Sequence, residues 1–405
     1  MKFETLTYIS QKLLKGNEKR YSKVVVNIAV AAVAVSIAVM IISVSVLKGF
    51  QYEIGRKIVG FSGQIRISTF STNVSLQASP LAIDPRIYQT IYKVAPTAKV
   101  TAYAMKGGII KANENIEGAI LKGVDSTYDF TFLRENLLMG RMPQLGSKGT
   151  EIVLSKNLSS KLDLKVGESL LMYFIEQPAR VRKLKIVGIY NTGLEEFDNR
   201  FIFGSLSMVQ KLNNWRKHEV DALEITLPEG TDVNALSEQL YQEVPSTLNV
   251  ETVRELYPQL FDWLKLQDLN VIIIVIMMLL VGTINMVTAL LILILEKSKT
   301  IGVLKSIGTN NADVMKIFML NAGRLILRGA VIGNAIGLLV ISIQHFFHLI
   351  PLDATSYYMS FVPVSFDLLS FLLINLISIG ISFICMAIPA LIIRKISPSK
   401  VIRYS

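Results

Sequence analysis

His345 and His348 are the two side chains of this sequence whose type and spacing could do chemistry. A helix would place residues three apart on one face, where two imidazoles can share a metal ion. No acidic residue or cysteine accompanies them at ligand spacing, and the sequence has one cysteine, Cys385. We therefore favour an interfacial histidine pair over a metal centre and predict no metal site.

Motifs for nucleotide binding and catalysis are missing from the sequence. It has no GxxxxGK[ST] phosphate loop, so we expect no ATP binding of the P-loop kind. HExxH and GxSxG patterns are absent as well. The acidic residues of the hydrophilic part are scattered and form no evident acid–base pair. We predict no catalytic residue and no cofactor, so any transport would draw its energy from a partner.

The composition and the charge pattern are those of a membrane protein. Apolar residues make up 51% of the 405 residues. The net charge of +11 comes from three segments that together hold 16 Lys/Arg and 4 Asp/Glu, namely residues 1–23, 296–328 and 394–405. These segments flank apolar stretches, as the positive-inside rule requires of cytoplasmic loops. A nucleic-acid-binding surface would gather its charge on a folded domain, so we exclude nucleic acid as a partner.

Four apolar stretches are long enough to cross a bilayer core of roughly 30 Å at about 1.5 Å per residue. We predict transmembrane helices at residues 24–47, 269–295, 325–350 and 368–393. None carries an ionisable residue deep within the span, which argues against a proton- or ion-coupled carrier. The charge rule places three segments in the cytoplasm: residues 1–23, the loop 296–324 and the tail 394–405. The loop 351–367 has no Lys or Arg and is expected outside.

A large hydrophilic insertion, residues 48–268, separates the first two predicted helices. Its alternating stretches predict strands at residues 64–68, 119–124, 151–155, 169–174, 181–190 and 222–227. Helical patterns lie at residues 84–94, 205–212 and 232–243. The predicted fold is thus an α-helical membrane protein with four transmembrane helices and a large α+β extracytoplasmic domain between helices 1 and 2.

The cytoplasmic loop contains a short amphipathic pattern. Ile301, Leu304 and Gly308 fall at i, i+3 and i+7, which predicts a helix over residues 300–307. Gly308 suits the position just past the end of that helix, and Asn310 suits the N-cap of the next one. Two interpretations remain open from the residues alone: a simple connector, or a coupling helix docked into a groove of a motor subunit.

Several short motifs in the right order resemble one known family, the FtsX/MacB-like permeases of ABC transporters, and within it the permease of the lipoprotein-releasing (Lol) system. The first is SVLKGFQYEIGRKIVGFSGQIRIS at residues 45–68, although Leu47 and Lys48 stand where the family usually has Met and Asn. The others are GVD at 123–125, EIVLS at 151–155, VGE at 166–168, VGI at 187–189, IGVLKSIG at 301–308, PA at 389–390 and SPSKVIRY at 397–404.

The resemblance implies that the cytoplasmic loop is a coupling helix seated on a separate ABC ATPase, which binds the ATP. The residues that would couple are Glu296, Ile301, Gly302, Leu304, Lys305 and Gly308. The resemblance also implies a second permease, either another copy of this chain or a paralogue. The expected location is the inner membrane of a bacterium, with the large domain in the periplasm.

The resemblance further implies that a lipoprotein enters from the outer leaflet and is passed to a periplasmic carrier. The expected entry slot in the lipid membrane is lined by Leu47, Phe50, Phe261, Trp263 and Leu264, although an interfacial aromatic belt would have the same composition. The place of the family's carrier-binding hairpin is taken by Phe174, Ile175 and Pro178. Two alternatives remain: MacB-like efflux to an outer-membrane exit duct, and a membrane scaffold or sensor without transport.

Overall fold

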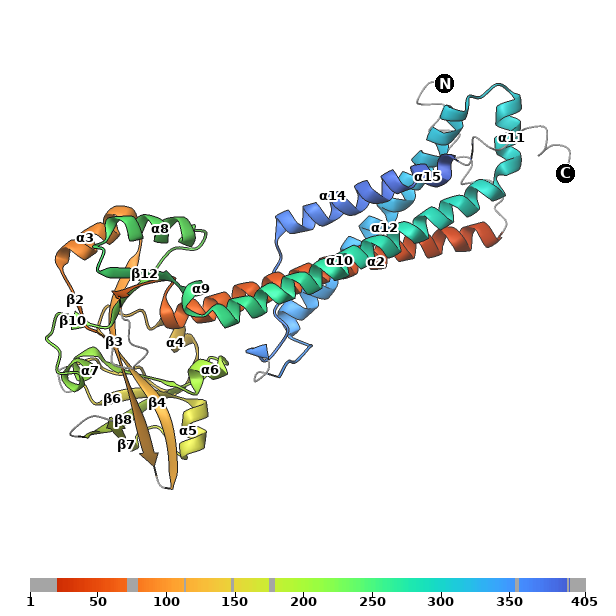
Figure 1. The fold of residues 1–405 in the computed structure, drawn as a ribbon. Coiled ribbons are helices and arrows are strands. Elements are labelled where there is room, and N and C mark those ends of the chain that lie inside the picture. The colour runs from red at the N-terminus through yellow and green to blue at the C-terminus, as the bar shows by residue number, and fades with distance from the viewer. Residues whose placement is uncertain are drawn as a thin grey trace. The chain divides into compact units, whose positions relative to one another are not determined.

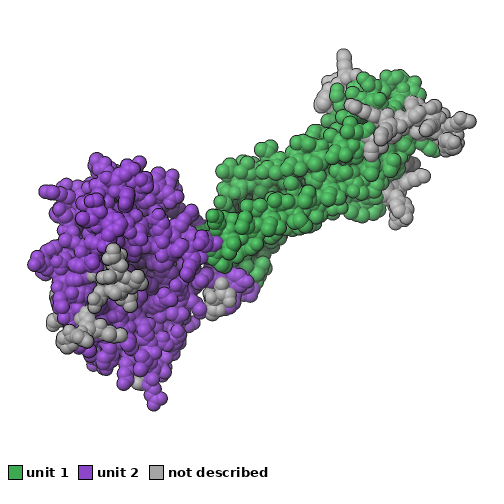
Figure 2. Space-filling view, in the orientation of Figure 1, with its two compact units in different colours: residues 1–51, 263–350, 362–405 green, residues 52–262, 351–361 purple. Residues whose placement is uncertain are grey.

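The structure is a computed structural model that describes residues 20–70, 79–112, 114–146, 149–174, 179–353, 357–391 and 393. The chain divides into two compact units (Figure 2). The helical unit comprises residues 1–51, 263–350 and 362–405, and the sheet unit comprises residues 52–262 and 351–361. The tail predicted at residues 394–405 and most of the segment 1–23 lie outside the described residues.

Four helices are long and apolar enough to cross a membrane, which confirms the predicted fold class. They are α2 (Arg20–Ser62), α10 (Pro258–Glu296), α12 (Asn311–Phe347) and α14 (Leu368–Cys385). The first three are longer than the predicted spans because no helix-breaking residue stands at the polar ends of those spans. Pro258, whose fixed φ suits a first turn, opens α10, and Gly63, at a φ of +64°, follows the last residue of α2.

Close backbone packing joins α12 to α2 within the helical unit. Gly329, Gly333 and Gly337 recur every four residues and so lie on one face of α12. A Cβ built on Gly333 would lie 2.5 Å from the carbonyl oxygen of Ala34, so only glycine allows the two helices to come this close. Small residues at such a crossing allow extensive van der Waals contact, which holds helices together where lipid removes the hydrophobic driving force.

The sheet unit contains strands covered by short helices (Figure 1). Its main sheet has ten strands in the order β12-β1-β11-β3-β4-β9-β6-β8-β5, and β7 pairs with β3 and β8. The strands are β1 (Ile65–Thr69), β3 (Lys99–Ala112), β4 (Asn115–Val124), β5 (Leu137–Gly140), β6 (Glu151–Ser155), β7 (Ser169–Phe174), β8 (Arg180–Tyr190), β9 (Phe201–Ser205), β11 (Ala222–Thr226) and β12 (Leu248–Thr252). A second sheet pairs β2 (Leu81–Ala82) with β10 (Glu219–Val220).

Helices cover the sheet and bury its apolar side chains. They are α3 (Pro85–Val94), α4 (Thr131–Glu135), α5 (Lys156–Leu162), α6 (Glu195–Asp198), α7 (Leu206–Leu212), α8 (Val233–Glu243) and α9 (Val253–Leu256). Asp84 caps α3 by accepting from the Arg86 N–H, and Asp232 caps α8 in the same manner. All six predicted strands and all three predicted helices of this region are present, within a few residues of their predicted ends.

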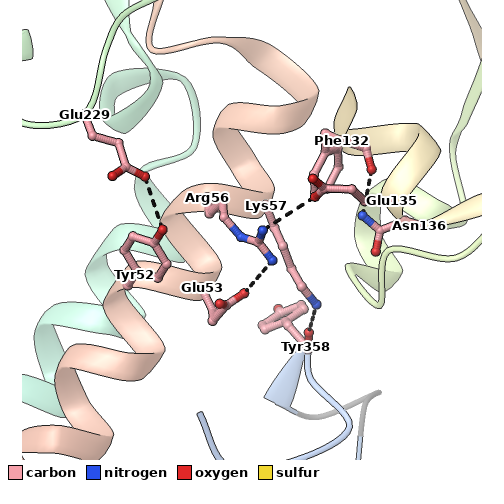
Figure 3. Close-up of polar contacts among 9 residues, drawn as sticks. All are labelled: Tyr52, Glu53, Arg56, Lys57, Phe132, Glu135, Asn136, Glu229 and Tyr358. Atoms are coloured by element: carbon pink, nitrogen blue, oxygen red, sulfur yellow. Dashed lines mark hydrogen bonds and ion pairs between the residues drawn. The ribbon is translucent and has the colours of Figure 1, made fainter. Parts of the chain in front are cut away.

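The connection between α12 and α14 contributes a short hairpin, residues 351–361, to the sheet unit. Pro351 and Phe361 form an antiparallel bridge, and the Leu352 N–H donates to the Ser360 carbonyl. The Lys57 ammonium donates to the carbonyl oxygen of Tyr358 over 2.8 Å (Figure 3). This unit is therefore assembled from two separate stretches of the chain.

Candidate functional site

The predicted coupling segment forms helix α11 (Ser298–Ser306), between α10 and α12. Gly308 follows it at a φ of +94°, a left-handed conformation that suits glycine, so the predicted stop is confirmed. Asn310 occupies the N-cap position of α12 with extended backbone, as predicted, although its side chain makes no capping hydrogen bond. The helix begins two residues before the predicted start, at Ser298.

The predicted apolar stripe of α11 is not the surface that this helix exposes. Ile301 is 0% exposed and packs in the core of the helical unit, and Gly302 is buried beside it. Leu304 is half-buried. The exposed apolar side chains of this segment are Val303, at 49%, and Ile307, at 76%. Ile301 therefore holds α11 against the bundle, and the next turn presents the apolar surface.

Polar residues tie this segment to the rest of the helical unit. The Lys305 ammonium donates to the carbonyl oxygen of Ile393 over 2.5 Å, while Glu296 and Gly308 are exposed. Ile393 follows α15 (Ala387–Ala390), at the far end of the α14 region. Lys305 thus links α11 to the segment that follows α15.

Helices α2 and α10 bring together two of the five predicted entry residues. The rings of Phe50 and Trp263 meet edge to face with their centroids 6.3 Å apart. One turn away, the Gln51 amide donates to the Asp268 carboxylate over 2.6 Å. Leu47 is half-buried and Leu264 is buried.

The fifth predicted entry residue, Phe261, belongs to the sheet unit. There the Arg254 guanidinium lies 5.5 Å from the centre of its ring, an ordinary cation–π distance. The structure thus groups Phe50 with Trp263 and gives Phe261 a partner of its own.

The predicted carrier-binding residues fall at the end of β7 and in the segment between β7 and β8. Ile175 and Pro178 fall outside the described residues, and Phe174 is 1% exposed in the core of the sheet unit. Leu171 and Val181 are exposed beside this segment, and Leu171 pairs across the strands with the exposed Lys183. The surface beside this segment is therefore apolar and basic, while Phe174 supports it from inside.

The histidine pair lies at the end of α12. Over the described ranges, no group of three His, Cys, Asp or Glu side chains could hold a metal ion. The ring of His345 contacts Phe346 edge to face, and His348 ends α12 in a left-handed conformation.

A buried ion pair in the sheet unit was not anticipated from the sequence. Lys122 and Glu224 lie 2.6 Å apart, N to O, with only 3% and 7% of their side chains exposed. The Lys122 ammonium also donates to the carbonyl of Phe61 and lies 4.8 Å from the centre of the Tyr103 ring. Burial raises the pKa of Glu224, and the charge of Lys122 opposes that rise. A charged residue within an otherwise apolar strand was the sequence signal for this pair.

Two further carboxyl groups in the sheet unit are buried. Burial raises the pKa of Asp198 to about 6, against hydrogen bonds from Thr192 and Gly193. Burial likewise raises the pKa of Asp221 to about 6, and its Oδ2 accepts from the Met105 N–H. Asp221 Oδ1 is buried without a hydrogen-bond partner among the described residues.

The last turns of α2 carry a polar network within the sheet unit (Figure 3). Tyr52 donates to Glu229 over 3.1 Å. Arg56 bridges Glu53 of its own helix, at 3.1 Å, and Glu135 of α4, at 3.6 Å. Together with the contact from Lys57 to the hairpin, these bonds join α2 to the loop at Glu229, to α4 and to the hairpin.

Comparison with known proteins relates both parts of the chain to one group of transporters. The family model described as MacB-like periplasmic core domain matches residues 28–243, and the model described as FtsX-like permease C-terminal matches residues 272–398. The lipoprotein-releasing system transmembrane protein LolC of Neisseria meningitidis serogroup B is 23% identical, over 99% of this chain and 100% of its own.

Two further proteins are similar to this chain. The lipoprotein-releasing system transmembrane protein LolE of Haemophilus influenzae is 19% identical, over 98% of each chain. The periplasmic region of MacB from Actinobacillus actinomycetemcomitans, a crystal structure, covers 48% of this chain and 91% of its own, with 12% identity and a TM-score of 0.35. Since the MacB-like family model alone matches more than half of the residues, the chain belongs to the FtsX/MacB-like family of ABC transporter permeases.

Proposed function

We propose that this chain is the membrane subunit of an ATP-driven transporter that extracts lipoproteins from the outer leaflet of a bacterial inner membrane and passes them to a periplasmic carrier. The observation that carries the proposal is the end-to-end match to lipoprotein-releasing permeases, which leaves neither the sheet unit nor the four helices unmatched. A shared domain alone would support only membership of the wider permease family.

The proposed energy source is a separate ATPase subunit that binds the ATP. Helix α11 supports this assignment because it presents Val303 and Ile307 to solvent next to exposed Lys299, while Ile301 anchors it internally. Apolar side chains at the centre of a docked helix, with charges at the rim, are the usual composition of such an interface. A second permease, identical or paralogous, completes the proposed transporter.

The proposed entry for the acyl chains lies at the outer ends of α2 and α10, at the pair formed by Phe50 and Trp263. Acyl chains gain about 0.8 kcal/mol per buried CH₂, so an extractor must offer them comparable surroundings. An edge-to-face aromatic pair can open by small ring movements and supply such a surface. The basic and apolar surface beside the segment between β7 and β8 is the proposed contact for the carrier.

The test is the distribution of lipoproteins between membrane fractions in cells that depend on the altered chain. Phe50→Asp and Trp263→Asp should each strand lipoproteins in the inner membrane. Leu266→Asp, at an exposed position on the same turn region of α10, is the matched control and should sort lipoproteins better than either. Normal sorting in cells depleted of the chain, together with greater sensitivity to exported drugs, would contradict the proposal and favour MacB-like efflux.

A further inference from the structure

A shallow, open hollow lies between the outer end of α2 and the start of α14, within the helical unit. Ile41, Val44, Ser45 and Lys48 line it from α2. Asp367, Ser370, Phe371 and Ile374 line it from the other side, with Ser365 and Phe366 of the preceding segment. In both helices the lining residues stand at i, i+3, i+4 and i+7, so each helix turns one continuous face toward the hollow.

The two faces carry the same gradient of polarity. Lys48 and Asp367 lie at one end of the hollow, and Ile41 and Ile374 lie at the other. Because α14 runs away from Asp367 while α2 runs toward Lys48, the charged ends meet and the apolar ends meet. A surface that changes from charged to apolar within two helical turns matches a molecule with a charged head and a hydrocarbon tail.

Most polar groups at the charged end already have partners. Ser45 donates to the Ser365 carbonyl over 2.6 Å, and the Ser365 N–H donates back to the Ser45 carbonyl. Asp367 accepts from the N–H groups of Leu369 and Ser370, so its carboxylate caps the first turn of α14. The hollow is thus formed by side chains of two helices and not by the N-terminus of α14 alone.

Lys48 is the exception. Its side chain is exposed, and its ammonium forms no hydrogen bond or ion pair with any residue that the structure describes. The side chain of Ser370 and the charge of Lys48 lower the pKa of Asp367, which therefore remains a carboxylate at neutral pH. One cation and one anion thus stand at the same end of the hollow.

We propose that this hollow binds a zwitterionic glycerophospholipid of the outer leaflet, with its phosphate on Lys48, its primary ammonium on Asp367 and an acyl chain against Val44, Phe371 and Ile374. An ammonium and a carboxylate side by side complement the two charges of a phosphoethanolamine headgroup. Lysine binds phosphate as a point charge and can reach the interface along its flexible stem. Neither Phe50 nor Trp263 lines this hollow, and the proposal does not depend on the transport proposal.

The experiment uses the full chain in nanodiscs that contain phosphatidylethanolamine, followed by extraction in mild detergent and native mass spectrometry of the retained lipid. Lys48→Asn should lower the retained phosphatidylethanolamine about fivefold, which corresponds to about 1 kcal/mol for one lysine near a phosphate. Lys265→Asn, which removes an exposed lysine of α10, is the matched control and should leave retention unchanged. Equal retention in Lys48→Asn and the unaltered chain would overturn the proposal.

Three further comparisons identify the ligand chemistry. Asp367→Asn keeps a side chain that can cap α14 and should lower retention of phosphatidylethanolamine but not of phosphatidylglycerol, which has no ammonium. Diacylglycerol with the same acyl chains should be lost, because it lacks the phosphate. Retention of diacylglycerol equal to that of phosphatidylethanolamine, or displacement of the lipid by millimolar inorganic phosphate, would overturn the assignment to a phospholipid.

Discussion

Gly49 of α2 lies directly against the backbone of Pro363: a Cβ built on Gly49 would come within 2.5 Å of the Pro363 carbonyl oxygen. The reciprocal hydrogen bonds between Ser45 and Ser365 hold the two segments together one turn below. Backbone atoms cannot rotate away from an added methyl group as a flexible side chain can. The approach of α2 to the segment before α14 therefore depends on glycine at this position.

The first prediction contrasts two glycines of α2. Gly49→Ala should lower the thermal midpoint of the purified full chain, since overpacking costs about 1–3 kcal/mol. Gly55→Ala should raise it, because nothing lies within 4 Å of the added Cβ and alanine is the better helix former, by about 0.5–1 kcal/mol. Thermal unfolding in one detergent measures both. A Gly49→Ala chain as stable as the Gly55→Ala chain would show that the segment at Pro363 can move aside.

The second prediction concerns the buried pair formed by Lys122 and Glu224. Lys122→Met leaves a buried carboxyl group without its cation and should destabilise the sheet unit by about 3–5 kcal/mol. The double variant Lys122→Met/Glu224→Leu should recover much of that loss, because neither charge is then desolvated. The control is Lys99→Met, which breaks the exposed pair with Asp129 and should cost no more than about 1 kcal/mol. A double variant no more stable than Lys122→Met alone would contradict this account.

The third prediction is a pH dependence that arises from Asp221. Its folded-state pKa of about 6 exceeds its ordinary value of 3.8, so the folded chain binds this proton more tightly than the unfolded chain does. Between about pH 4 and pH 6 the stability therefore falls as the pH rises, and the loss is complete above pH 6, at roughly 1–3 kcal/mol. Asp198 contributes in the same direction.

Asp221→Asn isolates this contribution. It should stabilise the chain at pH 7, where the native carboxylate is charged, and have much less effect at pH 4.5, where both side chains are neutral. The measurement is the difference between the thermal midpoints of the variant and the native chain across that range. A difference that does not change with pH would exclude Asp221 as the titrating group.

The fourth prediction rests on the proposed ATPase partner. Ile307→Asp should leave the thermal midpoint nearly unchanged and should abolish substrate-stimulated ATP hydrolysis in the reconstituted complex, since a hot-spot side chain is worth roughly 2 kcal/mol or more. Ile301→Ala should instead lower the stability of the helical unit by about 2–5 kcal/mol, because it opens a cavity in its core. If Ile307→Asp hydrolysed ATP as the native complex does, α11 would be only a connector.

Local signals in the sequence predicted individual elements well. The strand ends at residues 151–155 and 169–174 coincide with β6 and β7, because period-two alternation is a local signal. The long strand β3 was missed, since Gly107 and Gly108 interrupt its pattern. Gly108 stands where β7 packs closely: a Cβ on it would lie 2.9 Å from the Tyr173 carbonyl oxygen.

The candidate site was harder to predict, because burial depends on partners distant in the chain. Ile301 and Ile307 both lie in an amphipathic segment, and only the packing of the bundle shows that the first is internal and the second exposed. For the same reason, the ion pair between Lys122 and Glu224 could not be predicted from the sequence. The two residues belong to β4 and β11, and these strands are not neighbours in the sheet. Alternation of apolar and polar residues predicts which side chains are buried, but not which side chains they contact.

The hairpin at residues 351–361 has a consequence for biosynthesis. A ribosome adds about 5–20 residues per second, so the sheet unit waits for its last piece until α10 and α12 have left the exit tunnel. Until Tyr358 arrives, the Lys57 ammonium lacks its carbonyl acceptor. The sheet unit is thus completed only after α12 has been synthesised, and a chain that stops before residues 351–361 displays an unfinished surface to proteases.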